Sequence, residues 1–433
     1  MSILSRREFA IRAAAFGAVS SVGMPFAGLD KRKKKQEVVA TAEQAVPFKP
    51  SISGADSLRA HAEAVGLHFG VAVQTDLLDL RGVSGAGTSD AYTSAVLTQA
   101  DMLVAESAMK WRPMRPTATT YNFDDADKLF AFASSSGQLV RGHNLCWHEE
   151  LPDWFMATVN QDNAKDYLTD HISQVAGRYA GRVHSWDVVN EAVHVPDGRA
   201  DGLRQTPWLD LLGPEYIEIA FRAAAKADPA AKLTYNETNF ELDTPEHTAK
   251  RGQVLALLRR LHARNVPVHA VGLQSHLQAA GPQPGPGLVD FVREVGKLGM
   301  EVYVTEMDVN THALDGDDAA QDVSVAQVYH SYLTMLLPEP NVKAVLTWGL
   351  SDAKSWLNVL QKPWITRADG RRQRPLPLDE NFQPKEAFFQ IRDAFDASRQ
   401  GLKPTDITVP QGPQGDPWAP FAVPGSPKAM PKS

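Results

Sequence analysis

The amino-acid sequence predicts an α/β protein with one closed (β/α)8 barrel, the TIM barrel fold. Apolar, β-branched runs recur eight times, and the intervals between them are long enough for one helix each. Such runs are typical of strands buried on both faces, as in a parallel sheet covered by helices. Eight alternations favour a closed barrel over an open sheet. The absence of a Gly-rich phosphate-binding loop also weighs against an open nucleotide-binding sheet.

The expected strands follow one another along most of the chain, which at 433 residues is long enough for a barrel of the usual ~250 residues or more. Each strand is expected to end at the same rim of the barrel. The eight runs are residues 68–73, 102–105, 139–143, 184–189, 232–235, 268–273, 302–305 and 342–348.

Three of the intervals have apolar residues at the spacing of an amphipathic helix. The first is 215–226, preceded by Pro214, which suits the start of a helix. The second is 252–264, and Pro267 then forces the chain out of the helix. The third, 385–397, follows the last expected strand. We place the whole barrel domain within residues 43–400.

The amino-terminal residues predict export. Arg6 and Arg7 are followed by Phe9 and a weakly apolar stretch rich in Ala and Gly. This pattern is typical of a twin-arginine signal, although a disordered basic leader would share part of it. We expect residues 1–42 to be a signal and leader that is cleaved after Ala42, in a bacterial protein that is periplasmic or secreted. The stretch is too rich in Gly and Ser for a convincing membrane span, so no stable membrane insertion is expected after export.

The carboxyl-terminal residues and the overall composition exclude several classes of protein. Residues 401–433 are rich in Pro and Gly without periodic apolar positions, which predicts a disordered tail. The net charge of -7 comes from interspersed acids and bases, so a nucleic-acid partner is not expected. The single cysteine, Cys146, excludes an internal disulfide. We expect a monomer.

Two glutamates, Glu191 and Glu306, indicate the chemistry. Each follows an apolar run that reads as a buried strand. A carboxylate at the exit of such a strand contributes little to packing but is well placed for a reaction centre at the rim of a barrel. Two carboxylates that face each other across a cleft are what cleavage of a glycosidic bond requires. The pair therefore predicts a glycosidase.

Other polar and aromatic residues are found at the ends of at least five expected strands. Sugar rings have apolar C–H faces that stack on indole, so tryptophans beside a carboxylate pair predict a saccharide-binding cleft. His143 and His148 could suggest a metal, but nothing completes a ligand set, and we expect no metal and no cofactor. Glu106 and Lys110 could also form a surface ion pair of little energy. The residues at the rim are Glu106, Lys110, His143, Trp147, Gln274, His276, Asp308, Trp348 and Trp356.

Taken together, these motifs closely resemble glycoside hydrolase family 10, whose members are mostly endo-1,4-β-xylanases. The likeness runs from about residue 65 to 398, in register at most of the expected strands. The motifs are Met109-Lys110-Trp111, Gly142-His143 with Trp147-His148, Trp186 to Glu191, Gln274-Ser275-His276, Thr305 to Asp308 and Trp348-Gly349.

The resemblance implies a role for each of five residues at the reaction centre. Glu191 would be the acid/base and Glu306 the nucleophile of a retaining enzyme that forms a covalent glycosyl-enzyme intermediate. His276 and Asp308 would hold the charge of Glu306 and tune its pKa. Asn190 would bind the 2-hydroxyl of the sugar at the cleaved bond.

The resemblance also implies contacts with the substrate, which is expected to be xylan or a xylo-oligosaccharide. The glycone side of the cleaved bond would be bound by polar groups and aromatic walls, and an amide would lie near the leaving-group side. The implied contacts are Glu106, Lys110, His143, Trp147, Gln274, Trp348 and Trp356, with Asn236 near the leaving group.

Two departures from the family pattern affect residues near the cleft. Ser107 and Ala108 replace a Glu-Asn-Glu-Met-Lys-like sequence, and Ser107 would reach a sugar only through water. Asn144 and Cys146 stand where Thr and Val are commoner, and Cys146 is expected to pack as a small hydrophobe.

Two other functions are compatible with part of this pattern. One is hydrolysis of β-1,4-glucan or mixed-linkage glucan, because the two glutamates alone do not exclude it. The other is a carbohydrate-binding protein without catalysis, although binding alone would not require both Glu191 and Glu306.

Overall fold

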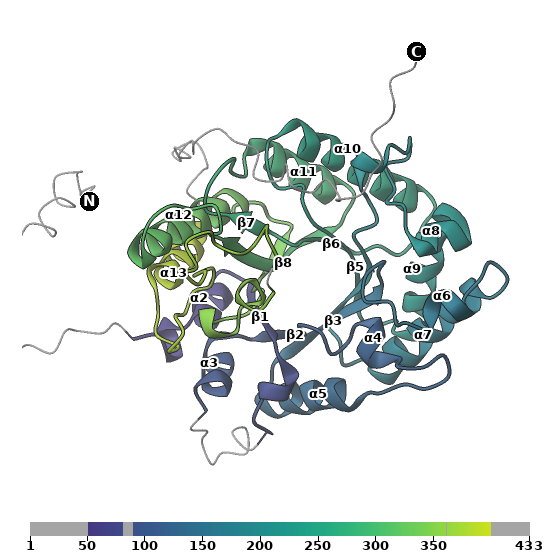
Figure 1. The fold of residues 1–433 in the computed structure, drawn as a ribbon, viewed down its shortest axis with the longest axis horizontal. Coiled ribbons are helices and arrows are strands. Elements are labelled where there is room, and N and C mark those ends of the chain that lie inside the picture. Colours follow the sequence, from purple (N-terminus) through teal and green to yellow (C-terminus); the bar gives the residue numbers. More distant parts are fainter. Residues whose placement is uncertain (1–50, 81–89, 361, 400–433) are drawn as a thin grey trace, which may run out of the picture. The chain divides into compact units, whose positions relative to one another are not determined.

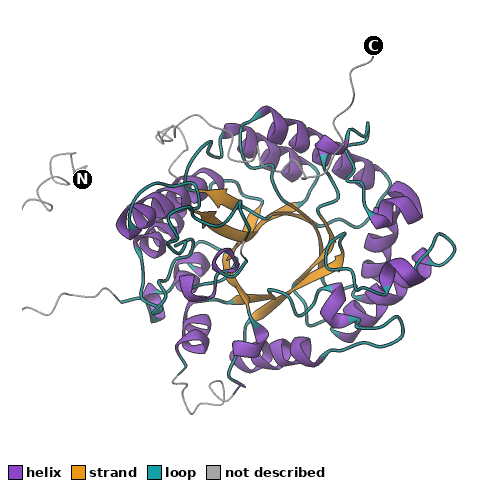
Figure 2. Ribbon diagram, in the orientation of Figure 1, coloured by secondary structure: helices purple, strands orange, loops and turns teal. Residues whose placement is uncertain are grey.

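A closed barrel of parallel strands forms the centre of the described residues. The computed structural model describes residues 51–80, 90–360 and 362–399, so the predicted leader (1–42) and tail (401–433) lie outside them. Viewed end-on, the strands form a ring with the helices outside it (Figures 1 and 2). The barrel strands are β1 (His68–Val73), β2 (Met102–Ala105), β3 (Leu139–Cys146), β4 (Ser185–Asn190), β5 (Lys232–Glu237), β6 (Ala270–Leu273), β8 (Glu301–Asn310) and β9 (Val342–Thr347).

Pairing between β6 and β8 closes the ring, because the other barrel strands pair in chain order from β1 to β6 and from β8 through β9 back to β1. A short strand, β7 (His276–Gln278), lies beyond β6 and pairs in parallel with the far end of β8. The barrel is therefore extended on one side of its carboxyl-terminal rim.

One main helix follows each barrel strand and covers its outer face. These helices are α3 (Ala91–Gln99), α5 (Asp124–Ser136), α7 (Ala164–Arg178), α9 (Tyr216–Ala227), α10 (Pro245–Ala263), α11 (Pro286–Lys297), α12 (Asp318–Leu336) and α13 (Glu386–Arg399). Shorter helices and turns lie before β1 or in the loops. They are η1 (Gly54–Asp56), α2 (Leu58–Glu63), η2 (Thr75–Leu77), α4 (Trp111–Met114), α6 (Phe155–Thr158), η4 (Val195–Asp197), α8 (Pro207–Leu212), η5 (Gly213–Glu215), η6 (Asp352–Lys354) and η7 (Trp356–Asn358).

The eight expected strands are all present, but two of them continue well past their expected ends. β3 runs on to Cys146, which pairs with Val189 of β4. β8 runs on to Asn310, because β7 supplies its ladder partners from Asp308 onward. Polar side chains are interspersed among the apolar ones at these ends, so the continuous apolar run stops before the strand does. As a result, the expectation that Glu306 ends its strand is wrong, and Glu306 lies in the middle of β8.

The three expected helices are confirmed as α9, α10 and α13, with one error at a start. α10 begins at Pro245 and not at residue 252. Thr244 caps this helix by accepting a hydrogen bond from the backbone N–H of His247, and Pro245 fits the first helical position. Pro214 lies in the η5 turn just before α9.

The hydrophobic core has two layers. The outer layer lies between the strands and the helices, and it contains fully buried Trp186 of β4. Gly142 makes room for this ring, since a Cβ atom there would lie 2.1 Å from it. The inner layer fills the barrel and reaches the carboxyl-terminal rim at Trp348. Its members are Ala72, Met102, Val104, Ala270, Tyr303, Ala344, Leu346 and Trp348.

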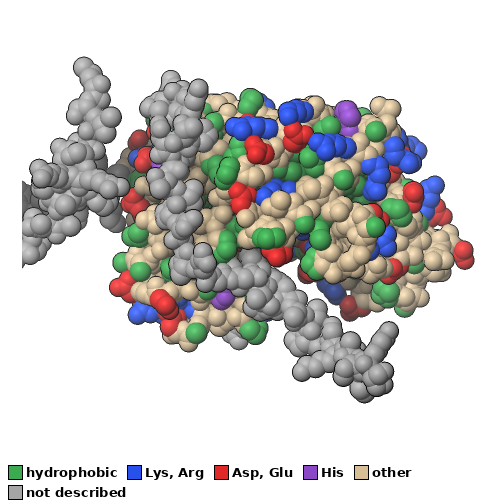
Figure 3. Space-filling model, turned by 90° about the horizontal axis from the view of Figure 1, so that it is seen from above, with side chains coloured by type: hydrophobic (Ala, Val, Ile, Leu, Met, Phe, Trp, Pro, Cys, Tyr) green, Lys and Arg blue, Asp and Glu red, His purple; other side chains and the backbone are tan. Residues whose placement is uncertain are grey.

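Charged side chains of both signs are interspersed on the face shown in Figure 3. This pattern agrees with the mixed charge of the sequence. Within the described ranges, no helix is both long enough and apolar enough to cross a membrane.

Candidate active site

A cleft of about 360 Å³ opens at the carboxyl-terminal ends of the barrel strands. Every site residue expected from the sequence lines it except Glu106 and Asn236. Strand exits far apart in the chain therefore converge on one rim, as the sequence predicted. The expected residues that line it are Lys110, His143, Trp147, Asn190, Glu191, Gln274, His276, Glu306, Asp308, Trp348 and Trp356.

Glu306 lies on the floor of the cleft and is only 5% exposed. Its Oε1 accepts a hydrogen bond from Nδ2 of Asn236 at 2.7 Å, and its Oε2 lies 3.4 Å from Nε2 of His276. Burial on its own raises the pKa of Glu306. The hydrogen bond from His276 and the field of nearby His143 outweigh burial, and together with the Asn236 amide they lower this pKa to about 2. The carboxylate is thus held in its ionised form.

His276 links Glu306 to a second carboxylate. Its Nδ1 lies 2.9 Å from Oδ1 of Asp308, which is fully buried. Burial lowers the pKa of His276, but Asp308 and Glu306 together raise it well above its usual value. Trp356 completes the arrangement, because its indole Nε1 donates a hydrogen bond to Oδ2 of Asp308 at 2.6 Å. The imidazolium is therefore held between two negative charges.

Glu191 stands in a tight turn directly after β4. Its φ of 57° lies in the left-handed region. Its backbone N–H donates to the carbonyl of Asn236, and its own carbonyl accepts from Nε of Arg204 at 2.8 Å. Its carboxylate Oε1 accepts from Nε2 of Gln274 at 2.9 Å, and Nη2 of Arg204 lies 3.9 Å from Oε2. This carboxylate projects into the cleft and, with its side chain 13% exposed, is more accessible than Glu306.

A buried ion pair supports the turn that carries Glu191. Glu237, at the end of β5, is fully buried and accepts the backbone N–H of Val193 at 3.1 Å. Its other oxygen lies 2.9 Å from Nζ of Lys250 on α10, which is itself almost entirely buried. The turn after β4 is thus tied to β5 and α10.

Asn236 lies beneath the cleft and forms hydrogen bonds with Glu306 and with Asn190, the residue before Glu191. Its Nδ2 donates to Oε1 of Glu306 and to Oδ1 of Asn190, the latter at 2.9 Å. Its Oδ1 accepts from the hydroxyl of Thr305 at 2.8 Å. Asn236 is fully buried, so the structure places it beneath the cleft and not on the wall where a sugar contact was expected. Gly272 leaves space for it, because a Cβ atom there would lie 2.0 Å from Oδ1 of Asn236.

Gln274 and His276 both face the cleft, but not by simple strand alternation. Ser275 between them has a φ of 62°. Its N–H donates to Oε1 of buried Glu241 at 2.9 Å, and its hydroxyl lies 2.6 Å from that of Tyr332. The left-handed residue redirects the chain so that Gln274 reaches Glu191 while His276 reaches Glu306.

His143, Trp147 and Trp348 lie side by side in the cleft lining. Nδ1 of His143 lies 2.9 Å from Oδ2 of buried Asp187, which fixes the ring, and the ring meets Trp348 edge-on at 5.3 Å. Nζ of Lys110 lies 5.2 Å from the ring centre of Trp147 and 5.9 Å from that of Trp348. This part of the lining combines indole faces with hydrogen-bonding groups, as a sugar site requires.

Glu106 and Ser107, which follow β2, lie outside the lining of the cleft. Glu106 does not line the cleft, and burial raises its pKa although Gln74 and Lys110 oppose the rise. Ser107 is exposed and also lies outside the lining. Cys146 is buried, in agreement with its expected packing role, and burial raises the pKa of its thiol.

Several residues that line the cleft were not expected from the sequence. Gln278 and Asn310 lie two residues beyond His276 and Asp308 on β7 and β8, so strand alternation could have identified them. The others lie in loops, where the sequence has no period to follow. They are Glu149, Glu150, Thr238, Asn239, Leu357, Leu360, Lys362 and Trp364.

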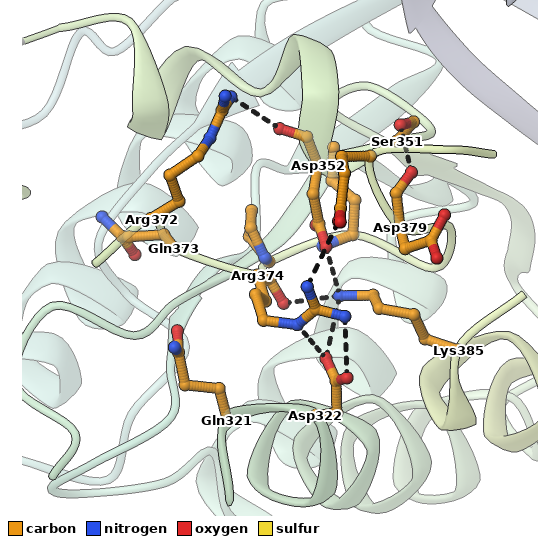
Figure 4. Close-up of polar contacts among 12 residues, drawn as sticks. Gln321, Asp322, Ser351, Asp352, Arg372, Gln373, Arg374, Asp379 and Lys385 are labelled. Carbon is orange, nitrogen blue, oxygen red and sulfur yellow. Dashed lines mark hydrogen bonds and ion pairs between the residues drawn. The ribbon is translucent and has the colours of Figure 1, made fainter. Parts of the chain in front are cut away.

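The loop between β9 and α13, which carries Trp356, is anchored by buried charges (Figure 4). Lys385 lies 2.8 Å from Asp352 and 3.4 Å from Asp322. Arg374 makes a two-pronged pair with Asp322, with both contacts shorter than 3 Å. Burial raises the pKa of Asp352 to about 6, although Lys385 opposes the rise. The loop is therefore fixed to α12 and to the start of α13.

The chemistry available in the cleft is that of two carboxylates in different surroundings. Glu306 is buried, ionised and held by hydrogen bonds, whereas Glu191 is partly exposed and contacts polar groups. Such a pair can attack an acetal carbon and exchange a proton with the departing oxygen. Among the described residues, no group of three or more His, Cys, Asp or Glu side chains is placed to hold a metal ion.

Comparisons with known proteins agree with this geometry. The family model for glycosyl hydrolase family 10 matches residues 57–394. A β-1,4-xylanase of Dictyoglomus thermophilum is 36% identical over 310 residues, covering 69% of this chain and 83% of that protein. Endo-1,4-β-xylanase B of Thermotoga neapolitana is 32% identical over 340 residues, covering 78% of this chain and 91% of that protein.

Solved structures show the same similarity. Native xylanase 10B from Thermotoga maritima superposes with a TM-score of 0.70 at 32% identity, covering 80% of this chain and 100% of that chain. Xylanase 10B from Thermotoga petrophila in complex with xylobiose gives a TM-score of 0.69 at 31% identity, covering 80% of this chain and 98% of that chain.

Proposed function

The chain belongs to glycosyl hydrolase family 10 and is a retaining endo-1,4-β-xylanase, and from this premise we propose that Glu306 is its nucleophile and Glu191 its acid/base. The observation that carries the assignment is the difference between the two carboxylates. The pKa of Glu306 is lowered to about 2, so it is ionised at neutral pH as a nucleophile must be. Glu191 is the more accessible carboxylate and lies where it can reach a leaving oxygen and then a water.

The reaction proceeds by two displacements. Glu306 attacks the anomeric carbon while Glu191 gives its proton to the departing glycosidic oxygen, and a covalent glycosyl-enzyme ester forms. Glu191, now a carboxylate, removes a proton from water, which attacks the same carbon and releases Glu306. Each step inverts the configuration, so the product retains it.

The neighbouring residues support these steps without taking part in bond exchange. His276 and Asp308 keep Glu306 ionised, and Asn190 is placed to bind the 2-hydroxyl of the sugar. Asn236, expected from the sequence to contact substrate, is proposed instead as a positioning residue, because it is buried and holds Asn190 and Glu306.

The remaining expected contacts are proposed to bind the sugar rings of xylan or xylo-oligosaccharides. Lys110 and Gln274 provide hydrogen-bond donors, and Trp147, Trp348 and Trp356 provide flat apolar faces. His143, fixed by Asp187, contributes an imidazole edge. Glu106 is proposed to act by orienting Lys110 from outside the lining.

The test is the release of reducing ends from glucuronoxylan and from a soluble β-1,4-glucan by the full chain. We expect strong release from xylan and little from glucan. Glu306→Ala should abolish release, and Glu191→Ala should lower it most for substrates with a poor leaving group. Equal release from both polymers would favour a glucanase, and binding without release would favour the carbohydrate-binding alternative.

The cellular location and the oligomeric state of the chain can also be proposed. We propose that the chain is exported through its twin-arginine sequence as a monomer, without stable membrane insertion after export, a nucleic-acid partner or a cofactor. Replacing Arg6 and Arg7 by Lys should keep the enzyme inside the cell, and unchanged export would contradict the proposed route. Light scattering of the purified protein should give the mass of one chain.

A further inference from the structure

The loop between β9 and α13 carries a tryptophan that the proposed substrate contacts do not include. Trp364 is half-buried and lines the cleft. Its ring centre lies 6.0 Å from that of Trp356, with the ring planes inclined by 57°. Trp356 in turn packs against the barrel-interior cluster that ends in Trp348. The aromatic surface of the cleft therefore continues past Trp356.

Apolar side chains exposed to solvent lie beside Trp364. Leu360 also lines the cleft and is 43% exposed, and Val359 beside it is 66% exposed. Large apolar residues that remain in water next to a binding cleft are typical of a surface that a ligand covers.

A cation adds a hydrogen-bond donor to this surface. Lys362 is exposed and lines the cleft. In the part of the chain that the structure describes, no carboxylate lies within ion-pair distance of its ammonium group. Its three N–H bonds are therefore available to the hydroxyl groups of a sugar.

Packing of the loop is the alternative explanation for Trp364. Trp364 itself packs against Trp356 within the loop. The loop already has another anchor, the buried pair of Lys385 with Asp352. The loop therefore does not depend on Trp364 alone for its attachment, and the place of Trp364 in the cleft lining favours a role in substrate binding.

We propose that Trp364, together with Leu360 and Lys362, forms an additional subsite that binds one more β-1,4-linked xylosyl unit beyond those at Trp348 and Trp356. The indole face stacks on the C–H face of the sugar, and Lys362 donates to its hydroxyls. This inference rests on the proposed function, because it names a further part of the same substrate.

The test compares kcat/KM for linear xylo-oligosaccharides of increasing length, from xylotriose to xylohexaose, using the full chain. For Trp364→Ala we expect kcat/KM to fall ~5-fold to ~10-fold on the oligosaccharides long enough to reach the subsite, as the loss of one aromatic stack predicts. The shortest substrates should be affected less than about 2-fold, since they do not reach the subsite. Trp364→Phe, which keeps a flat ring, should restore most of the loss.

Two further variants separate binding from disturbance of the loop. Thr366→Ala changes an exposed side chain of the same loop that does not line the cleft, and it should leave every kcat/KM unchanged. Lys362→Met changes an exposed residue that the fold does not need, and it should lower kcat/KM on long substrates only.

The outcomes distinguish a failure of the additional subsite from a failure of the proposed function. If Trp364→Ala lowers kcat/KM equally at all lengths, or at none, while the parent enzyme cleaves the whole series, the additional subsite is wrong and the function stands. If the parent enzyme cleaves no xylo-oligosaccharide, both are wrong.

Discussion

The ionisation of Glu306 depends most on the imidazole of His276. Burial would otherwise favour the neutral acid, and the contact with His276 is the largest influence that opposes it. Asp308 matters indirectly, because together with Glu306 it raises the pKa of His276 well above the usual value. The charge of the nucleophile is thus maintained by a chain of three residues.

Replacing His276 by Asn should move the acid limb of the activity profile. In the parent enzyme the pKa of Glu306 is about 2, so the free enzyme should lose kcat/KM by protonation of this group only in strong acid. The Asn side chain carries no charge, so the pKa of Glu306 should rise, and the acid limb should move up by about 1 to 3 pH units. The measurement is kcat/KM for a xylo-oligosaccharide across the pH range.

His262→Asn is a suitable control for this change, because His262 is exposed on α10 and does not line the cleft. Its profile should match that of the parent. An unchanged acid limb in His276→Asn would mean that His276 does not set the charge of Glu306.

The sequence predicted the place of some single residues in the site but not of others. The cleft residues at strand exits could be identified, because strand ends meet at one rim in any parallel barrel. Arg204, Glu241 and Trp364 could not, because they lie in loops whose path the sequence pattern does not describe. The burial of Asn236 was missed for another reason, since it depends on the space left by Gly272 on the neighbouring strand.

Among the strands, β6 contributes to the site because Gly272 has no side chain and so leaves room for Asn236. Gly272→Ala would place a methyl group 2.0 Å from Oδ1 of Asn236 and 2.9 Å from Thr305. Asn236 must then shift, which disturbs its hydrogen bonds to Asn190 and Glu306. We expect kcat to fall ~100-fold, as for a misplacement of about 1 Å in a catalytic group.

The matched control for this substitution is Gly252→Ala on α10, where nothing lies within 4 Å of the added methyl group. It should leave kcat unchanged and raise helix stability slightly. A folded Gly272→Ala enzyme with normal kcat would show that the position of Asn236 is unimportant.

The anchored loop between β9 and α13 predicts a stability effect. Lys385→Met removes the cation that faces Asp352 and Asp322 and leaves buried carboxylates without it, at a cost of about 3–5 kcal/mol in the free energy of unfolding. The folded pKa of Asp352 is already raised, and it should rise further. The loss should therefore be largest at pH values above this pKa and smaller as pH falls through it.

Urea denaturation at pH 8 and pH 5 measures both effects. Lys343→Met, at an exposed position on β9, is the control and should change stability little. A loss that does not depend on pH would show that Asp352 is not the group left unpaired.

The sequence predicted the elements well where burial leaves a pattern. The barrel strands have continuous apolar runs because both their faces are covered. β7 was missed because it is short and polar, and its partner is the equally polar end of β8. The start of α10 was missed because the residues from Pro245 to Arg251 have no regular apolar spacing, although Thr244 and Pro245 form a recognisable start.

For the molecule as a whole, buried and half-buried histidines that stay neutral should lower stability in mild acid. Burial and neighbouring cations lower the pKa of His148 to about 3 and those of His184 and His247 to about 4. Below pH 6.5 the unfolded chain takes up protons at these residues while the folded chain does not. Stability should therefore fall as pH falls from 6.5 towards these folded values.

His171 offers a direct test of this effect. It is fully buried, stacks on Trp111 with ring centres 3.7 Å apart, and has no hydrogen-bond partner at either ring nitrogen. Burial and the charge of Arg115 lower its pKa well below the usual value. Below pH 6.5 the free energy of unfolding of His171→Phe should fall less steeply than that of the parent. The two slopes should differ by about 1.4 kcal/mol per pH unit.

Denaturation midpoints between pH 7.5 and 5 measure this slope. At pH 7.5 the variant should be at least as stable as the parent, because Phe keeps the stack and removes two unpaired polar atoms. His262→Phe, at an exposed position, should keep the slope of the parent. Equal slopes in all three proteins would contradict the prediction.

Glu306 lies within a strand and Glu191 in a turn, so the two side chains should differ in mobility. Glu306 lies within β8, where strand pairing is present up to Val304 and resumes at Met307, and its backbone N–H donates to the carbonyl of Gln274, so its position should fluctuate little. Glu191 follows the last residue of β4 in a turn held by a few side chains, so it should have the larger amplitude of the two. This matches their tasks, because the nucleophile meets one carbon atom throughout the cycle, whereas the acid/base must serve first a departing oxygen and then an incoming water.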